Sequence, residues 1–486
     1  MSAEPSKYSR HAKAQDGRQP VRLTPQTTRA PIPLILVLLL ATALRAHNLD
    51  GVSFWSDETR SALVALNEPV QIITGAVADV HSPAFYLLEH YWIKGLGQND
   101  YSIRLLSAFA GVLTVATTFA VGKRIWCADT ASVASLLVSA SEFHLRLTQE
   151  ARPYALLSLF TVASFLVLTR LVQRPSVQTA FNYFLVTIPL IYIHPYGLIM
   201  VATQNLFVFL QWRSGKCLPG WVLQWFLIQC ALLLAYSPWL AQFTTQLSRV
   251  QQGVLPYYDL PTASSVIGTL LEFANLSRYL LGLLLFLATV AFVGIRTNSD
   301  QSLTSMLGVW LIAPISLAFL VSWMLTPIYD TRGLIGSSPA LYILAAHGFH
   351  KLRSRYLQAM LLAIMAAFCG EALWYYYPNV KTDDWRGAAK IIAAQAQPGD
   401  TLCVIEYYDD ALRYYLTRTD LTVGCDDILE ALANPDKSPK LPDRFWFLNQ
   451  TNALPSTHPQ QVLNPHYTIS KFDLIGLQLS LFERKQ

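Results

Sequence analysis

Long apolar runs separated by short charged connections dominate the chain from residue 31 to residue 377. A helix needs roughly 20 apolar residues to cross a bilayer core of about 30 Å. About eleven runs approach that length, which predicts a membrane domain of about eleven helices. The approximate spans are 31–48, 103–122, 128–146, 154–172, 179–193, 195–212, 221–240, 276–295, 304–325, 333–349 and 357–377.

Basic residues alternate between the two sides of these runs. With the N-terminus inside, the connections predicted to be cytoplasmic hold ten Lys and Arg residues, whereas the short outer connections hold two. Cytoplasmic loops of membrane proteins are enriched in Lys and Arg. This distribution predicts a basic cytoplasmic tail over 1–30, a multi-pass domain in the plasma (inner) membrane and an extracytoplasmic C-terminus. A cleaved leader also fits the first run, but its basic tail is long for one, so we interpret the run as an uncleaved anchor.

Two polar blocks interrupt the apolar pattern, and both fall on the predicted outer side. The first outer loop, 47–99, contains amphipathic pieces such as 84–92, which are typical of helices at a membrane surface. The second block is the tail 378–486. Its spacing predicts helices over 385–396 and 409–416 and strands over 401–407, 444–448 and 477–482. The predicted fold is an α-helical polytopic membrane protein with a small C-terminal α/β domain.

Composition agrees with this organisation. Residues of the AVILMFWYC class make up 53% of the chain and charged residues only 14%, whereas soluble domains carry about 25% charge. The net charge of +5 would suit a nucleic-acid partner, but the basic residues are dispersed rather than gathered on one stripe. We therefore predict the lipid bilayer, and no nucleic acid, as a partner.

Of the six cysteines, only Cys403 and Cys425 fall in the predicted outer domain. An oxidising compartment would permit them to form a disulfide, while two buried thiols fit the sequence equally well. No cysteine spacing is typical of a metal site.

Ionisable side chains cluster where the predicted outer loops meet the membrane. Asp57 and Glu58 follow the first run closely, and neighbouring side chains diverge on a helix or a strand, so one would react while the other positions. His81 precedes the amphipathic piece of the same loop, and Arg152 lies in the short turn after the third run. Ionisable groups at membrane depth are costly, which indicates a functional site.

Together these clusters resemble the bacterial branch of the GT-C membrane glycosyltransferases, which includes protein O-mannosyltransferases and the aminoarabinose transferase of lipid A. The matching motifs are Asp-Glu at 57–58, His-Ser-Pro at 81–83, Gln-Glu-Ala-Arg-Pro-Tyr at 149–154, His-Pro-Tyr-Gly at 194–197 and Asp-Trp-Arg-Gly-Ala-Ala at 384–389. We interpret the last motif as a fold signature rather than a site. Ser82 stands where the family often has proline, and Gly333 follows Arg332 where it often has tyrosine, which implies a reshaped donor pocket.

The resemblance implies an inverting glycosyltransferase that moves a sugar from a polyprenyl phosphate to a glycan, lipid or protein acceptor on the outer face. Because the leaving group is already a phosphate anion, it needs no general acid, unlike the leaving group of a glycosidase. One base and nearby cations suffice. The implied site residues are Asp57 as the base, Glu58 orienting Arg60 or the acceptor, Arg152 and then Arg332 binding the phosphate, and His81 and Tyr154 as hydrogen-bonding partners.

Two other functions stay open. A polymerase or ligase that joins whole lipid-linked glycans would share the donor chemistry. A transporter or flippase would show inverted repeats and broken helices, and we find no internal repeat. The pattern identifies no cofactor. A divalent cation at Asp57 and His81 stays open, although no dense ligand spacing supports it.

Overall fold

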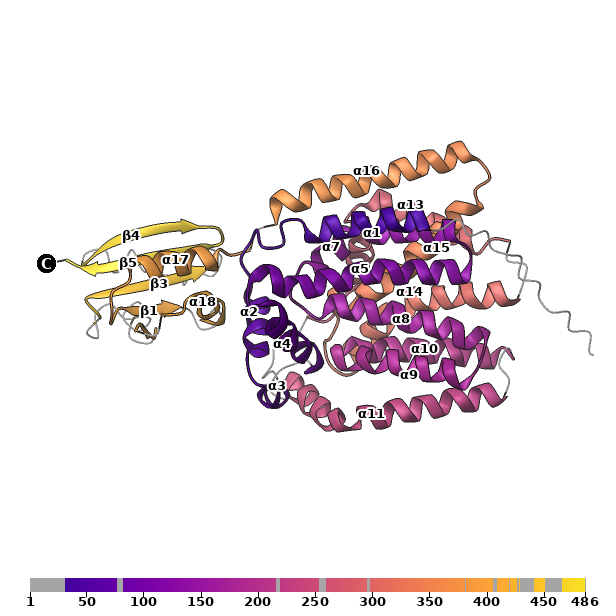
Figure 1. The fold of residues 1–486 in the computed structure, drawn as a ribbon, viewed down its shortest axis with the longest axis horizontal. Coiled ribbons are helices and arrows are strands. Elements are labelled where there is room, and N and C mark those ends of the chain that lie inside the picture. Colours follow the sequence, from indigo (N-terminus) through magenta and orange to yellow (C-terminus); the bar gives the residue numbers. More distant parts are fainter. Residues whose placement is uncertain are drawn as a thin grey trace, which may run out of the picture.

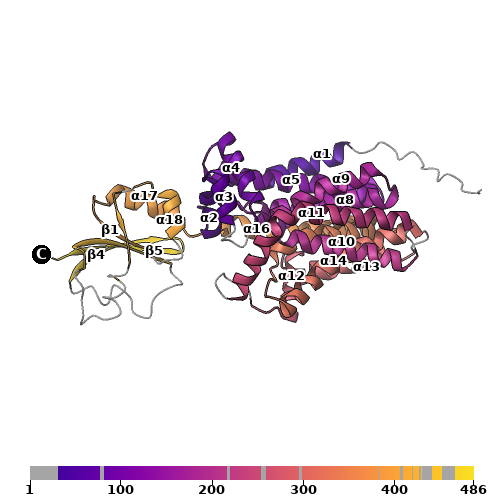
Figure 2. The same cartoon turned by 90° about the horizontal axis from the view of Figure 1, so that it is seen from below.

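The computed structural model describes residues 31–76, 82–215, 219–252, 259–294, 298–380, 382–404, 409–418, 420–425, 428, 441–450 and 466–485. A long bundle of helices carries a small sheet domain at one end (Figure 1). The helices of the first outer loop lie at that same end in both views (Figure 2). The predicted tail 1–30 and the candidate His81 lie outside the described residues.

Each apolar run predicted to cross the membrane is helical. These runs correspond to α1 (Pro31–Ala46), α5 (Asp100–Ile125), α6 (Ala128–Ala140), α7 (Glu142–Thr148), α8 (Tyr154–Gln173), α9 (Val177–Ile193), α10 (Tyr196–Arg213), α11 (Pro219–Gln251), α13 (Arg278–Ala291), α14 (Asn298–Met324), the 3-10 helix η1 (Arg332–Ser337), α15 (Ser338–Lys351) and α16 (Arg355–Asn379). Among the described helices, five are long and apolar enough to span a bilayer: α5, α8, most of α11, most of α14, and α16. The helical membrane architecture is confirmed, and the number of eleven crossings stays a prediction.

The continuous helix predicted over 128–146 is wrong, because the chain breaks between α6 and α7. Ser141 adopts an extended conformation, and its side-chain oxygen accepts a hydrogen bond from the backbone N–H of His144 at the start of α7. The carbonyl groups of Val138 and Ser139, left open at the end of α6, accept hydrogen bonds from the buried Arg45. Ser141 caps α7, and Arg45 binds the open carbonyl groups at the end of α6. These contacts stabilise the break between the two helices.

Burial separates the centre of the bundle from its periphery. The side chains of α15 are nearly all buried, and α6, α13 and α14 pack against it. In contrast, α11 and α16 lie on opposite edges of the bundle in Figure 1, and few of their apolar side chains are buried by protein. Exposed apolar surface on this scale is stable only where lipid covers it.

The C-terminal domain contains a mixed sheet. Its described strands are β1 (Thr401–Val404), β2 (Thr422–Val423), β3 (Arg444–Gln450), β4 (Tyr467–Leu474) and β5 (Leu477–Arg484), in the spatial order β2-β1-β3-β5-β4. The strand β1 pairs in parallel with β2 and β3, and β5 pairs antiparallel with β3 and β4. The predicted α/β fold is confirmed, and β2 and β4 were not predicted. Apolar and polar residues alternate in each half of the edge strand β4, but the alternation changes phase between Ser470 and Lys471, so no single period of two runs through the strand.

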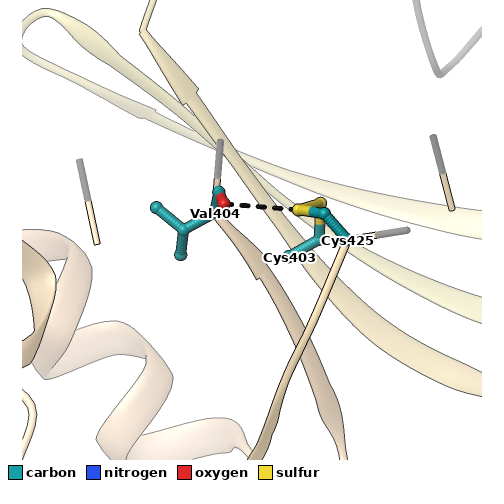
Figure 3. The surroundings of a disulfide bond; sticks show 3 residues. All are labelled: Cys403, Val404 and Cys425. Carbon is teal, nitrogen blue, oxygen red and sulfur yellow. Dashed lines mark hydrogen bonds between the residues drawn. A yellow bond between two sulfur atoms is a disulfide. The ribbon is translucent and has the colours of Figure 1, made fainter. Parts of the chain in front are cut away.

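Two apolar clusters cover the two faces of this sheet. On one face, α17 (Trp385–Gln395) and α18 (Asp409–Tyr415) pack on Leu402 and Trp446. On the other face lies the disulfide between Cys403 and Cys425, which joins β1 to the residues after β2 (Figure 3). The structure thus decides for the disulfide where the sequence left both forms open.

Three helices of the first outer loop complete the junction between the two parts. They are α2 (Ser56–Ala65), α3 (Pro69–Ala76) and α4 (Ala84–Leu96), while α12 (Ala263–Glu272) precedes α13. The amphipathic piece predicted over 84–92 therefore forms the first part of α4. An apolar cluster that includes Phe54, Ala62 and Ala151 joins this loop to the membrane helices, and Tyr414 and Tyr415 of the C-terminal domain pack against it.

Candidate active site

Asp57 lies in the first turn of α2. The helix starts after Trp55 because Trp55 is extended. The backbone N–H of Trp55 donates to the carboxylate of Glu58 at 3.4 Å. Acidic side chains are favourable in a first turn, where the helix dipole is positive. The side chain of Asp57 keeps 37% of its surface exposed, so it is available to a reactant.

Two arginines from distant parts of the chain meet the carboxylate of Asp57. Its Oδ2 lies 3.5 Å from Nη2 of Arg152, in the turn between α7 and α8. The same oxygen lies 3.8 Å from Nη1 of Arg332, which begins η1. The structure therefore brings together three of the residues singled out in the sequence, in a constellation with one carboxylate and two guanidinium groups.

Each arginine is oriented by further contacts. Arg152 is nearly fully buried, and its Nη1 donates to the backbone carbonyl of Asp57 at 3.2 Å and to Ser61 Oγ at 2.9 Å. Arg332 pairs with Asp330 at 3.1 Å and lies 5.3 Å from the ring centre of Tyr154. An aromatic face near a guanidinium attracts it electrostatically, so Tyr154 contributes its ring to the site.

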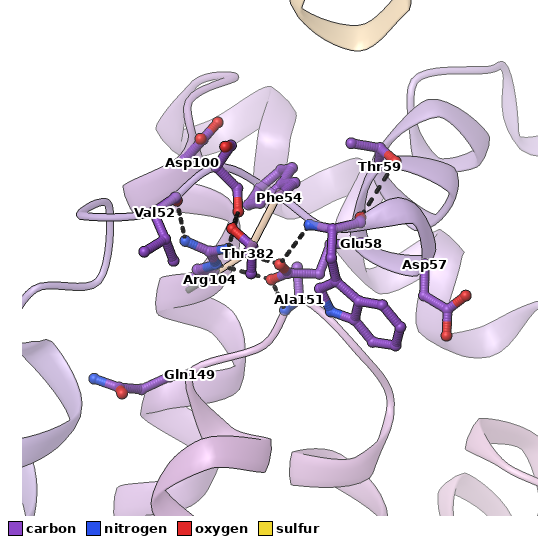
Figure 4. A network of polar contacts seen from close by, with 12 residues as sticks. Val52, Phe54, Asp57, Glu58, Thr59, Asp100, Arg104, Gln149, Ala151 and Thr382 are labelled. Atoms are coloured by element: carbon purple, nitrogen blue, oxygen red, sulfur yellow. Dashed lines mark hydrogen bonds and ion pairs between the residues drawn. The ribbon is translucent and has the colours of Figure 1, made fainter. Parts of the chain in front are cut away.

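The side chain of Glu58 points away from that of Asp57, as Figure 4 shows. It is fully buried and accepts hydrogen bonds from Nε and Nη2 of Arg104 at 2.8 and 2.6 Å. A third bond comes from the backbone N–H of Ala151 at 2.7 Å. Of the two predicted partners of Glu58, Arg60 is exposed on α2, and the buried carboxylate pairs with the buried Arg104 instead. A role of Glu58 toward the acceptor stays a prediction.

Arg104 was not among the candidates from the sequence. It lies in α5, at the beginning of the run predicted to cross the membrane at 103–122. An ionisable residue inside such a run is unusual enough to have drawn attention. Through Glu58 it joins α5 to α2 and to the turn that carries Arg152.

Two more acids near the site were given no role from the sequence. Glu89, on α4, is fully buried, and neither of its carboxyl oxygens has a hydrogen-bonding partner in the described part of the chain. Burial raises the pKa of Glu89 well above its ordinary value, more than the charge of Arg152 lowers it. Burial also raises the pKa of Glu150, beside Arg152 in the chain, to about 7.

Tyr196 braces the turn that carries Arg332. Its hydroxyl donates to the carbonyl of Ile328 at 2.6 Å and accepts from the backbone N–H of Asp330 at 2.7 Å. The ring occupies the space into which a side chain at 333 would project, since a Cβ atom on Gly333 would lie 2.6 Å from it. Glycine at this position, which departs from the family pattern, is therefore matched to a tyrosine from another motif.

Over the described ranges, no group of three or more His, Cys, Asp or Glu side chains is arranged to hold a metal ion. The pair proposed for a divalent cation includes His81, which lies outside those ranges.

Comparison with known proteins gives a match at the level of structure. No family model and no curated protein matches the sequence. The apo structure of ArnT from Cupriavidus metallidurans has a TM-score of 0.62 at 13% identity, covering 92% of this chain and 97% of that one. The structure of the same protein bound to undecaprenyl phosphate has a TM-score of 0.60 at 14% identity, covering 93% and 99%. The chain shares the fold of these two ArnT structures.

A structure of a second protein agrees with this result. It is an oligosaccharyltransferase of Archaeoglobus fulgidus, tethered with an acceptor peptide, with a TM-score of 0.53 at 10% identity. The match covers 80% of this chain but only 63% of the archaeal protein. The resemblance predicted from the motifs is therefore confirmed at the level of the fold.

Proposed function

We propose that this protein is an inverting glycosyltransferase, which moves a sugar from a polyprenyl phosphate to an acceptor hydroxyl at the outer face of the membrane. The observation that carries the proposal is the carboxylate of Asp57, partly exposed and within 4 Å of two guanidinium groups. The likeness to ArnT bound to undecaprenyl phosphate supports a lipid-linked donor. A glycan, a lipid or a protein could supply the hydroxyl.

In this mechanism Asp57 accepts the proton of the acceptor hydroxyl while the oxygen attacks the anomeric carbon. The bond between that carbon and the phosphate oxygen breaks on the opposite side, and the electron pair leaves with the polyprenyl phosphate. A well-placed base contributes about 10² to 10⁴ in rate. No acid is needed for departure, because the leaving group is stable as an anion.

Arg152 and Arg332 would bind the phosphate oxygens. Guanidinium groups bind phosphate with two parallel hydrogen bonds, and those that are already oriented stabilise charge without reorganising. Arg152 is held by the backbone of Asp57 and by Ser61, so the base and the first cation keep a fixed separation. Arg332 is more exposed than Arg152 and would meet the head group of an arriving lipid donor.

Asp57→Asn tests the proposal directly. The purified variant should fold normally and lose transfer from a labelled lipid-linked sugar by about 10² or more, because the amide cannot accept the proton. Glu68→Gln is the matched control, since Glu68 is an exposed acid of the same loop. Wild-type turnover in Asp57→Asn would remove this residue from the mechanism.

Arg332→Gln tests the leaving-group side. Loss of one oriented cation should lower kcat/KM by about 10² to 10³ without affecting stability, because Arg332 is partly exposed. Arg152 is less suitable for this test, since its removal would also disturb the start of α2.

Transfer of a whole lipid-linked glycan is a second candidate. The likeness to the archaeal oligosaccharyltransferase favours it. Both reactions use the same donor chemistry, so the size of the product distinguishes them. Mass spectrometry of the acceptor after reaction would show one added sugar or an entire oligosaccharide.

A further inference from the structure

The C-terminal domain contacts the backbone of residues 50–54, here called the approach segment, which leads into Asp57. Arg386, on α17, donates Nη1 to the carbonyl of Asp50 and Nη2 to that of Val52, each at 3.1 Å. The same guanidinium pairs with Asp100 at the start of α5. Because Arg386 binds backbone carbonyl groups, it constrains the path of the chain and not only the surface of the loop.

Tyr415, at the end of α18, holds the last residue of the approach segment. Its hydroxyl accepts the backbone N–H of Phe54 at 2.7 Å and donates to Asp100 at 2.6 Å. The ring of Phe54 is fully buried and lies 5.3 Å from that of Tyr414. A buried backbone N–H is costly to leave without an acceptor, so the hydroxyl of Tyr415 fixes Phe54 in this position.

The approach segment is held from both sides. Thr382, at the entry to the C-terminal domain, donates to the carbonyl of Ser53 at 2.6 Å. From the membrane domain, Arg104 donates to the carbonyls of Val52 and Ser53 at 2.9 and 3.2 Å. The chain therefore enters α2 along a path set jointly by the membrane helix α5 and by the outer domain.

We propose that the C-terminal domain is a positioning element for the active site, in which Arg386 and Tyr415 hold the approach segment so that Asp57 faces its two arginines. This inference rests on the proposed function. Asp57 follows Phe54 by three residues and lies in the first turn of α2, so the direction of the carboxylate depends on where the segment ends. A displacement of about 1 Å in a reacting group can cost about 10² in rate. The Asp-Trp-Arg motif at 384–386, read from the sequence as a fold signature, thereby gains a role in positioning.

The alternative is that these contacts only attach the domain to the membrane helices. The two possibilities differ in what the variants Tyr415→Phe and Arg386→Lys should do. Tyr415→Phe keeps the ring but removes the acceptor for the N–H of Phe54. Arg386→Lys keeps the charge beside Asp100 but cannot donate to two carbonyls in a fixed fork. Positioning predicts a catalytic defect in both, whereas simple attachment predicts none as long as the domain stays folded.

The experiment combines hydrogen exchange with kinetics on the full-length protein in detergent. Exchange of the peptide spanning 50–60 reports on the approach segment, and steady-state transfer from a lipid-linked sugar gives kcat and KM. Arg418→Lys is the matched control: Arg418 is an arginine of the same domain that pairs with Asp420 and donates to the carbonyl of Ala396, within the domain itself.

In Tyr415→Phe and Arg386→Lys we expect the approach segment to exchange about tenfold faster, because buried amide protection depends on these bonds. We expect kcat to fall by about 10- to 100-fold, with KM for the donor within about twofold, because both arginines remain. The control should match the wild type in both measurements.

Three results would overturn the inference. Unchanged exchange in both variants would show that the domain does not hold the segment. Faster exchange with a wild-type kcat would show that the segment does not position Asp57. A wild-type protein that transfers no sugar would overturn the proposed function, and the positioning role with it, so the two failures are distinguishable. Should Tyr415→Phe fail to fold, Arg386→Lys carries the same test.

Discussion

The neighbouring acids Asp57 and Glu58 should separate completely into one catalytic and one structural residue. Glu58→Gln removes the negative charge that Arg104 faces inside the protein, where the side chains of Glu58 and Arg104 are only 1% and 4% exposed. Arg104 would then carry an uncompensated charge in a buried site. Asp57→Asn, by contrast, weakens two contacts of 3.5 and 3.8 Å around a side chain that is 37% exposed.

The size of the effect follows from burial. Removing one partner of a buried ion pair typically costs about 3–5 kcal/mol. The amide oxygen of Gln at position 58 would also be a weaker acceptor than the carboxylate for the backbone N–H of Ala151. We therefore expect Glu58→Gln to lower the free energy of unfolding by about 3–5 kcal/mol. The carboxylate of Asp57 is partly exposed and its two contacts are longer, so Asp57→Asn should cost less than Glu58→Gln, even though Arg152 is buried.

Reversible unfolding in mixed detergent micelles measures both variants. The double variant Glu58→Gln with Arg104→Met removes the stranded charge and should be less destabilised than the sum of its single changes, by about 0.5–3 kcal/mol. It should not return to the wild-type stability, because Arg104 also binds backbone carbonyls of the approach segment. If Glu58→Gln unfolds like the wild type yet loses turnover, Glu58 has a chemical role and the structural reasoning is refuted.

Three further predictions test other parts of the molecule. The pKa of Glu89 is raised in the folded state above its ordinary value of 4.5, so the free energy of unfolding falls as the pH rises above that value. Glu89→Gln should therefore be more stable than the wild type at pH 8 and equally stable near pH 4. Equal melting temperatures of the two proteins at both pH values would contradict this. Gly333→Ala should raise KM for the lipid-linked donor about tenfold, because the added Cβ atom would lie 2.6 Å from the Tyr196 ring and displace the turn that carries Arg332. An unchanged KM would argue against a tight turn. Reducing the Cys403–Cys425 disulfide, which spans 22 residues, should lower the free energy of unfolding of the C-terminal domain by about 3 kcal/mol. Faster proteolysis of the reduced domain would report this loss. Equal resistance with and without reductant would show that the bond adds no stability.

The sequence predicted the architecture well because that architecture depends on local pattern. Apolar runs of membrane length determine helices whatever their neighbours are, and the periodicity of 385–396 is enough to predict α17. The break at Ser141 escaped this reasoning. It depends on Arg45 from another helix, which satisfies carbonyl groups that the pattern of 128–146 does not reveal.

For the active site, the sequence by itself determined which residue types stand in the outer loops, and Asp57, Arg152 and Arg332 were recognisable from motif and side of the membrane. Only the tertiary structure decided their partners. Glu58 is paired with Arg104 and not with Arg60, and this assignment depends on which surfaces meet when α2, α5 and the C-terminal domain pack. A charge is recognisable in a sequence, but the low-dielectric surroundings that decide whether it reacts or stabilises exist only once distant segments have excluded water around it.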